Sequence, residues 1–221
     1  MRLYSILPFI AASFSCGTLA EDHAPGISPD AALARLKAGN ARFVAGELSH
    51  PNQGPARRTK LSEGQRPFAI ILGCSDSRTP PEVIFDQGLG DLFVVRSAGN
   101  VVDDVALGSI EYAVEHLGSS LIVVLGHENC GAVKATVDGG DLPGHLPAIA
   151  KAIRPAVKAS AHHPGDPLDN AVLENARLEA QRVATSKPIL QKLVEEGKVR
   201  VVAARYDLNT GRVVFLAPRK D

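Results

Sequence analysis

Two uninterrupted apolar segments, residues 68–73 and 121–125, stand out from an otherwise mixed pattern of apolar and polar positions. A continuous apolar run of this length is typical of a parallel strand that is covered on both faces. Residues 92–95 predict a further strand, and residues 103–118 carry apolar side chains at helical spacing before the second segment. Strand, helical crossover and strand predict a βαβ arrangement and therefore a largely parallel sheet.

The remaining pattern predicts helices around this sheet. Ser28-Pro29-Asp30 marks a helix start, because serine is a favoured N-cap, proline suits the first helical position and an acidic residue suits the dipole there. Residues 46–66, with two prolines and a basic cluster, predict an irregular connection. Further helices are predicted over residues 145–160, about 170–186 and 188–197, and a closing β-hairpin over residues 199–204 and 213–216. We expect one α/β domain without an interdomain linker.

Residues 1–20 have the pattern of a secretory signal peptide. Arg2 is followed by a mostly apolar stretch at residues 3–14 and by small residues before a cleavage point near Ala20. The stretch is too short to span a bilayer, so no stable membrane insertion is expected. Cleavage would export the chain to the periplasm and leave residues 21–221 as one mature domain with an N-terminal helical arm.

The net charge and the number of cysteines limit which partners and which cysteine chemistry the chain is expected to have. The 221 residues carry 24 basic and 24 acidic side chains, which gives a formal net charge of zero. This balance offers no electrostatic basis for binding nucleic acid or an anionic membrane surface. Of the three cysteines, Cys16 lies in the predicted signal and leaves a lipid-modified N-terminus as an alternative. The mature chain would then contain Cys74 and Cys130.

Candidate metal ligands follow both apolar segments. The first segment runs into Cys74-Ser75-Asp76-Ser77-Arg78, and the second runs into His127 and Cys130. Sites in open α/β sheets lie at the carboxyl ends of the strands, so these side chains would meet if the two strands are neighbours. Two cysteines and one histidine suit zinc, and a catalytic zinc keeps its fourth position for water. The pattern therefore predicts a catalytic Zn²⁺ site made by Cys74, His127 and Cys130.

Asp76 and Arg78 add acid–base chemistry beside that site. Bound Zn²⁺ lowers the pKa of a coordinated water toward neutrality, so a nucleophilic hydroxide forms without a strong general base. Asp76 could orient that hydroxide, or it could bind zinc as a fourth ligand in a closed state. A bidentate pair with Arg78 would hold the carboxylate off the metal.

A non-catalytic reading competes with the metal site. Two cysteines in an exported protein are often a disulfide, here between Cys74 and Cys130. That alternative explains the thiols and gives no role to His127, Asp76 or Arg78. The spacing therefore favours metal over disulfide.

These residues resemble those of the β-class carbonic anhydrases. Residues 74–78 reproduce the family's first motif, and Gly126-His127-x-x-Cys130-Gly131 reproduces its second. Further likeness is found at residues 91–100, at residues 109–113 and in Tyr206-Asp207-x-x-Thr210-Gly211. The match runs from about Gln65 to Leu216, which is most of the predicted mature chain.

By this resemblance Cys74, His127 and Cys130 are the zinc ligands, and Asp76 with Arg78 is the catalytic dyad. The expected activity is that of a lyase, the reversible hydration of carbon dioxide to bicarbonate and a proton by attack of zinc-bound hydroxide. One alternative is a zinc hydrolase relative that acts on carbonyl sulfide or carbon disulfide.

The resemblance also implies a substrate pocket and an assembly. Gln65 matches a glutamine that hydrogen-bonds substrate from a neighbouring subunit, and Phe93 and Tyr112 match apolar walls of the carbon dioxide pocket. The family fold is a mostly parallel central sheet, about four parallel strands plus an antiparallel last strand, flanked by helices. Its members are obligate dimers or assemblies of dimers, so a homodimer or a larger assembly is expected.

One form of regulation is not expected here. Some members of the family bind bicarbonate at a second site through a tryptophan three residues before the first zinc cysteine and an arginine on the following strand. Arg96 matches that arginine, but Ile71 occupies the tryptophan position. Isoleucine has no N–H to donate, so we expect no inhibitory bicarbonate site and an open zinc site at neutral pH.

Overall fold

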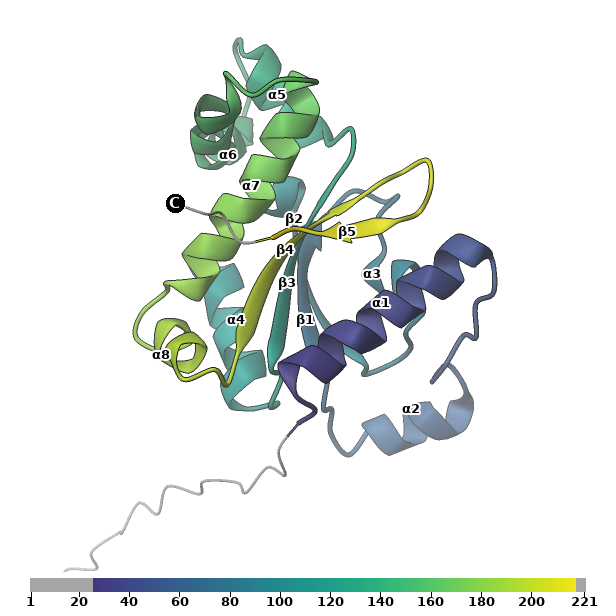
Figure 1. Cartoon of the computed structure of the whole chain (residues 1–221). Coiled ribbons are helices and arrows are strands. Elements are labelled where there is room, and N and C mark those ends of the chain that lie inside the picture. Colours follow the sequence, from purple (N-terminus) through teal and green to yellow (C-terminus); the bar gives the residue numbers. More distant parts are fainter. Residues whose placement is uncertain (1–25, 218–221) are drawn as a thin grey trace, which may run out of the picture.

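A five-stranded sheet runs through the centre of the molecule, with helices on both faces (Figure 1). The computed structural model describes residues 26–217. The strands are β1 (Ala69–Cys74), β2 (Leu92–Ser97), β3 (Leu121–His127), β4 (Arg200–Tyr206) and β5 (Val213–Phe215). They lie in the order β2-β1-β3-β4-β5, and only the β4–β5 pair is antiparallel among the described strands. The predicted fold class is confirmed, including the antiparallel last strand.

Helices connect and cover the strands. They are α1 (Pro29–Ala45), α2 (Pro55–Leu61), α3 (Pro81–Ile84), α4 (Asp104–Glu115), α5 (Gly131–Asp138), α6 (Leu146–Ser160), α7 (Pro167–Ala184) and α8 (Leu190–Glu195), with a 3₁₀ turn η1 (Ala98–Asn100) after β2. Figure 1 shows α1 on one side of the sheet and α4, α7 and α8 on the other.

The two faces of the sheet bury two separate apolar layers, because successive residues of a strand point to opposite sides. Ile71 of β1 packs with Leu36 of α1 on one face. Ile70 of the same strand packs with Ile110 of α4 and Ala176 of α7 on the other. Each of these aliphatic side chains is fully buried, and burial of each leucine or isoleucine stabilises the fold by roughly 1.5–3 kcal/mol. Continuous apolar runs are needed because both faces are covered.

Local sequence signals set several helix ends. The Ser28 hydroxyl accepts a hydrogen bond from the backbone N–H of Ala31 at 3.2 Å, which confirms the predicted start of α1. Gly46 ends that helix in the left-handed region, with a φ of 72°. Asp103 caps α4 in the same manner as Ser28 caps α1, and Asp166 caps α7.

Two helices differ from the sequence prediction. Residues 46–66 are not irregular throughout, because α2 forms within them after Gly54, with Pro55 at its first position. None of the α2 residues is buried, so no apolar periodicity marks this helix. The eight-residue α5 was not predicted either, and Val133 is its one buried residue.

The predicted signal peptide at residues 1–20 lies outside the described residues. Within residues 26–217, no helix combines the length and the apolar character that crossing a membrane requires.

Candidate metal centre

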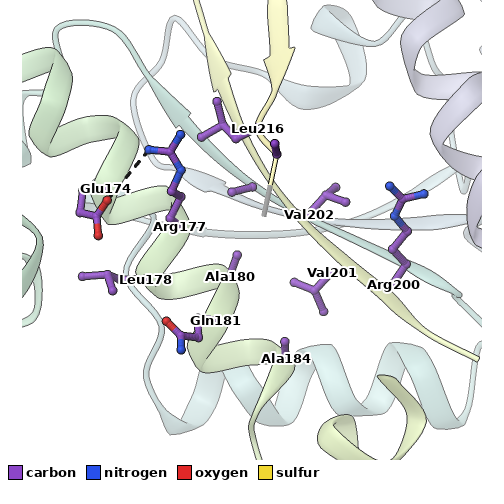
Figure 2. A pocket seen from close by; sticks show the side chains of 12 residues that line it. Glu174, Arg177, Leu178, Ala180, Gln181, Ala184, Arg200, Val201, Val202 and Leu216 are labelled. Atoms are coloured by element: carbon purple, nitrogen blue, oxygen red, sulfur yellow. Dashed lines mark ion pairs between the residues drawn. The ribbon is translucent and has the colours of Figure 1, made fainter. Parts of the chain in front are cut away.

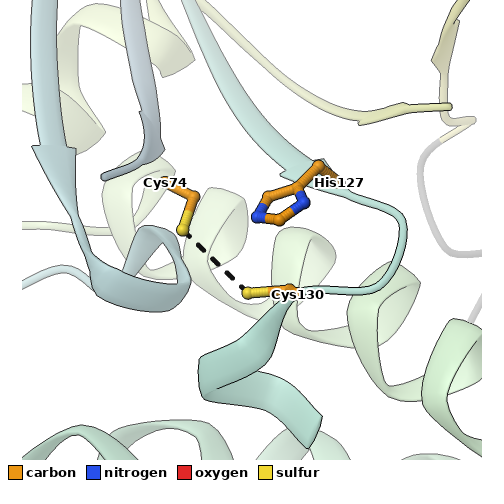
Figure 3. A group of neighbouring side chains, drawn as sticks. All are labelled: Cys74, His127 and Cys130. Carbon is orange, nitrogen blue, oxygen red and sulfur yellow. Dashed lines mark hydrogen bonds between the residues drawn. The ribbon is translucent and has the colours of Figure 1, made fainter. Parts of the chain in front are cut away.

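The carboxyl ends of β1 and β3 bring the three predicted ligands together. Cys74 is the last residue of β1, His127 is the last residue of β3, and Cys130 is the N-cap of α5. β1 and β3 pair directly, with Gly73 opposite Leu125. The ligand atoms of the three side chains lie within 4.8 Å of one another, and Figure 3 shows the imidazole ring turned toward both sulfur atoms.

The chemistry of this group fits a zinc ion. The two sulfur atoms are 4.0 Å apart and belong to free cysteines, so the structure contains no Cys74–Cys130 disulfide. Nδ1 of His127 lies 2.9 Å from the backbone carbonyl of Glu128 and can donate to it, which leaves Nε2 with a lone pair. Nε2 is buried and has no hydrogen-bond partner among the described residues. A buried, unpartnered imidazole nitrogen beside two thiols is the donor set of a zinc site.

The two thiols are arranged to carry one negative charge between them. The pKa of Cys74 is lowered to about 3, first by the hydrogen bond from Cys130 and further by contacts with His127 and the Gly99 N–H, while burial opposes the shift. The pKa of Cys130 is raised, chiefly by the same partner. The pair therefore shares one proton, and a cation at the site would displace it.

Asp76 and Arg78 form the bidentate pair that was expected from their spacing. Arg78 donates from Nε to Oδ1 at 2.9 Å and from Nη2 to Oδ2 at 2.7 Å, and its backbone N–H also donates to Oδ1. These hydrogen bonds hold the pKa of the Asp76 carboxyl well below its usual range. Oδ2 lies 3.8 Å from Nε2 of His127, so the ionised carboxylate borders the ligand group while Arg78 restrains it.

Arg96 supports the backbone of the motif in a way that sequence did not reveal. Its Nε donates to the carbonyl of Cys74 at 2.9 Å, and its Nη2 donates to the carbonyl of Asp76 at 2.6 Å. Ile71, at the position that a tryptophan would need for an anion site, is fully buried in the core. A motif cannot indicate these bonds, because they go to main-chain carbonyls.

The η1 turn also contacts the group. The backbone N–H of Gly99 donates to Sγ of Cys74 at 3.3 Å. The sequence marks this position only as a glycine in a turn.

The three predicted pocket residues do not reach the ligand group of their own chain. Phe93 pairs in register with Ile70, four residues before Cys74, which separates them by about 13 Å along the strands. Tyr112 lies beside Phe93, with ring centroids 6.5 Å apart, and is 49% exposed. Gln65 is exposed in the segment before β1. Within one chain these residues lie toward the amino ends of the strands, whereas Cys74 lies at the carboxyl end of its strand.

A separate groove of about 300 Å³ lies between α7 and β4 (Figure 2). It is lined in part by Arg177, Gln181 and Val202, and Arg177 forms an ion pair with Glu174 at 4.0 Å. None of the predicted site residues lines this groove.

Comparison with known proteins places these features in a family. A family model described as carbonic anhydrase matches residues 69–213. A carbonic anhydrase of Mycolicibacterium smegmatis is 43% identical over 193 residues, covering 86% of this chain and 94% of the relative. Carbonic anhydrase 2 of Mycobacterium tuberculosis is 41% identical over 195 residues, with the same coverage of both chains.

Solved structures show the same fold. One of two tetrameric β-carbonic anhydrases from the ascomycete Sordaria macrospora superimposes with a TM-score of 0.68 at 28% identity, covering 85% of this chain and 97% of that one. A Coccomyxa β-carbonic anhydrase in complex with acetazolamide gives a TM-score of 0.64 at 28% identity, covering 86% of this chain and 85% of that one.

Proposed function

The chain belongs to the β-carbonic anhydrases, a family of lyases, and on that premise we propose that it hydrates carbon dioxide reversibly at a zinc ion held by Cys74, His127 and Cys130. The observation that carries this proposal is the buried meeting of two thiols and an unpartnered imidazole nitrogen, bordered by a carboxylate that an arginine restrains.

The metal would activate water, and Asp76 and Arg78 would orient it. Zinc held by two thiolates and an imidazole would supply the Lewis acid that makes water nucleophilic near neutral pH. Asp76 is ionised, so its Oδ2 can accept a hydrogen bond from the attacking water and fix the water's orientation. Arg78 holds both carboxylate oxygens, which keeps Asp76 from turning toward the ligand group.

Carbon dioxide is apolar and needs an apolar pocket wall close to the metal. We assign that wall to Phe93 and Tyr112 of a second copy, with Gln65 of the same copy donating a hydrogen bond to substrate or product. Gln65 and Tyr112 are exposed, Phe93 is half-buried, and all three lie toward the amino ends of their own chain's strands, which supports a contribution across an interface. The proposed unit is therefore a homodimer or an assembly of dimers.

A direct test joins metal analysis to a rate measurement. Purified protein should contain one zinc per chain and should hydrate carbon dioxide in a stopped-flow assay with a pH indicator. Carbonyl sulfide and carbon disulfide, tried in parallel, should be poor substrates. Absence of zinc, or zinc without carbon dioxide hydration, would contradict the proposal.

Export is a second proposal, and it rests on the sequence of residues 1–20. Intact mass measurement of protein from the native host should show a mature chain that begins near Glu21. Cytosolic material that retains Met1 would refute export, and a lipid mass on Cys16 would refute cleavage at Ala20.

A further inference from the structure

Helix α7 carries a line of polar residues that the mechanism leaves without a role. Asn175 is 1% exposed and Glu179 is 5% exposed, although both lie beside the apolar residues that pack this helix on the sheet. Arg182 continues the line, and the three positions are spaced to lie along one side of the helix. Burying an amide and a carboxylate is unfavourable unless each is hydrogen-bonded, so their partners show what the line does.

All three side chains bind one loop, residues 99–102. Asn175 donates from Nδ2 to the carbonyl of Gly99 at 2.8 Å. Glu179 accepts from the backbone N–H of Val102 at 3.2 Å, and Arg182 donates to the carbonyl of Val102 at 2.5 Å. The loop is thus held at both of its ends by a helix that begins 65 residues after Val102, at Pro167.

Gly99 links this line to the metal centre. Its carbonyl receives the Asn175 amide, while its N–H donates to Sγ of Cys74 at 3.3 Å. The residue adopts a φ of 72°, and a Cβ at this position would come within 2.7 Å of Ile153 Cδ1. Glycine adopts this φ without strain, so the turn is free to move unless it is held, and Asn175 supplies a buried bond to it on the side away from the sulfur.

We propose that Asn175 is a positioning residue for the metal centre, holding Gly99 so that its N–H stays directed at the Cys74 sulfur. The inference rests on the proposed zinc site. A backbone N–H that donates to a ligating sulfur fixes the sulfur's orientation and withdraws charge from it. Without the amide, the Gly99 carbonyl would be buried without its partner, and the turn would shift to find another one. The sulfur would then lose its donor although no ligand had changed.

The test compares two asparagines of the same helix. Asn170 also donates from Nδ2 to loop carbonyls, those of His163 and Pro164, but this loop makes no contact with the ligands. Asn170→Ala therefore removes amide-to-carbonyl hydrogen bonds from the same helix, at an exposed place away from the ligands. In chelator competition, Asn175→Ala should bind zinc about 10-fold more weakly than wild type, and Asn170→Ala should match wild type.

Two further readouts separate positioning from general destabilisation. With Co²⁺ in place of zinc, the sulfur-to-metal charge-transfer band should move in Asn175→Ala and stay fixed in Asn170→Ala. Hydrogen exchange of the segment 98–102 in the zinc-loaded protein should speed up in Asn175→Ala only. If Asn175→Ala does not fold, Asn175→Ser takes its place, with zinc affinity expected between those of wild type and the 10-fold loss.

Equal zinc affinity and an unmoved cobalt band in wild type and the Asn175 variant would overturn the inference while leaving the zinc site intact. Equal loss in the Asn170 and Asn175 variants would overturn it too, because the effect would then follow from helix stability. Failure of the wild-type protein to bind zinc would instead refute the proposed function.

Discussion

At the carboxyl ends of the strands the three predicted ligands are buried side by side, whereas at the amino ends the predicted pocket residues are exposed or only half-buried. Cys74, His127 and Cys130 are each at most 5% exposed. Tyr112, at the other edge, is 49% exposed. The difference supports the proposal that one chain holds the metal by itself and contributes its pocket residues to a second copy.

The physical basis of this difference is the kind of side chain at each end of the strands, polar at the carboxyl ends and aromatic at the amino ends. Thiols, an imidazole and a carboxylate need fixed partners, and strand ends, Arg78, Arg96 and the η1 turn provide them within the chain. Aromatic rings need only another surface to cover them, and a second copy can provide it. Variants at the two edges should therefore fail in different ways.

The largest effect is expected from removing a ligand at the carboxyl edge. Cys130→Ser should weaken zinc binding by more than about 100-fold, the upper range for residues that merely support a ligand, and should abolish carbon dioxide hydration. The serine hydroxyl does not ionise near neutral pH and is a much poorer zinc ligand than a thiolate. Zinc content by atomic emission and the stopped-flow rate check both parts. A variant with full zinc and full rate would exclude Cys130 from the site.

Asp76→Asn should separate metal binding from catalysis. The amide has nearly the same shape, so zinc should stay bound, but it is neutral and its NH₂ group would face the Arg78 guanidinium. The loss of an oriented hydrogen-bond acceptor should lower kcat by about 10²–10⁴-fold. Zinc analysis of the same sample is the control. Near-normal turnover would remove Asp76 from the catalytic assignment.

Whether the residues at the amino ends of the strands serve a second copy can be tested by co-expressing two variants. Gln65→Ala should retain zinc and lose roughly tenfold in rate, the worth of one hydrogen bond to substrate. If Gln65 serves the site of a second copy, a heterodimer of Gln65→Ala and Asp76→Asn chains contains one intact site. Co-expression of both variants in equal amounts should then restore roughly a quarter of the wild-type activity, since half of the dimers are mixed.

Recovery no greater than the average of the two separate variants would place Gln65 in its own chain's site and break the comparison of the two edges. Gel filtration of the mixed sample confirms that both variants assemble to the same size.

The sheet and the ligands could be predicted from sequence because each is encoded locally. Continuous apolar runs indicate strands that are covered on both faces, and the residues directly after them must lie at the carboxyl edge. Helices α2 and α5 were missed for the opposite reason, since one is exposed and the other is short with a single buried residue. The antiparallel hairpin of β4 and β5 was found from its two strand patterns and the turn between them.

The supporting residues could not be predicted in the same way. Arg96 and Asn175 act on backbone carbonyls, and any donor of suitable reach would look the same in sequence. A polar line along α7 has the spacing of an ordinary solvent-facing side, so only the packing of α7 on the sheet reveals that it is buried. The location of Gln65, Phe93 and Tyr112 was implied by family resemblance and by no local pattern.

The smallest effect on turnover is expected from adding bicarbonate, because we expect no inhibitory second site for it. A second, inhibitory anion site near the zinc would need donors, and the Ile71 side chain is apolar and fully buried while Arg96 already binds two carbonyls. Placing an anion there would leave it short of a donor, a penalty of about 1–3 kcal/mol.

Because Arg78 keeps the pKa of Asp76 far below neutrality, protonation of that carboxyl should not affect how turnover depends on pH between pH 6 and 9. We therefore expect turnover to rise with pH through one non-cooperative titration and bicarbonate to act as simple product. Arg96→Ala, which frees the carbonyls of Cys74 and Asp76, should lower turnover rather than relieve inhibition. A steep, cooperative pH profile that bicarbonate shifts to higher pH, and that Arg96→Ala abolishes, would show that the carboxyl edge contains an anion switch after all.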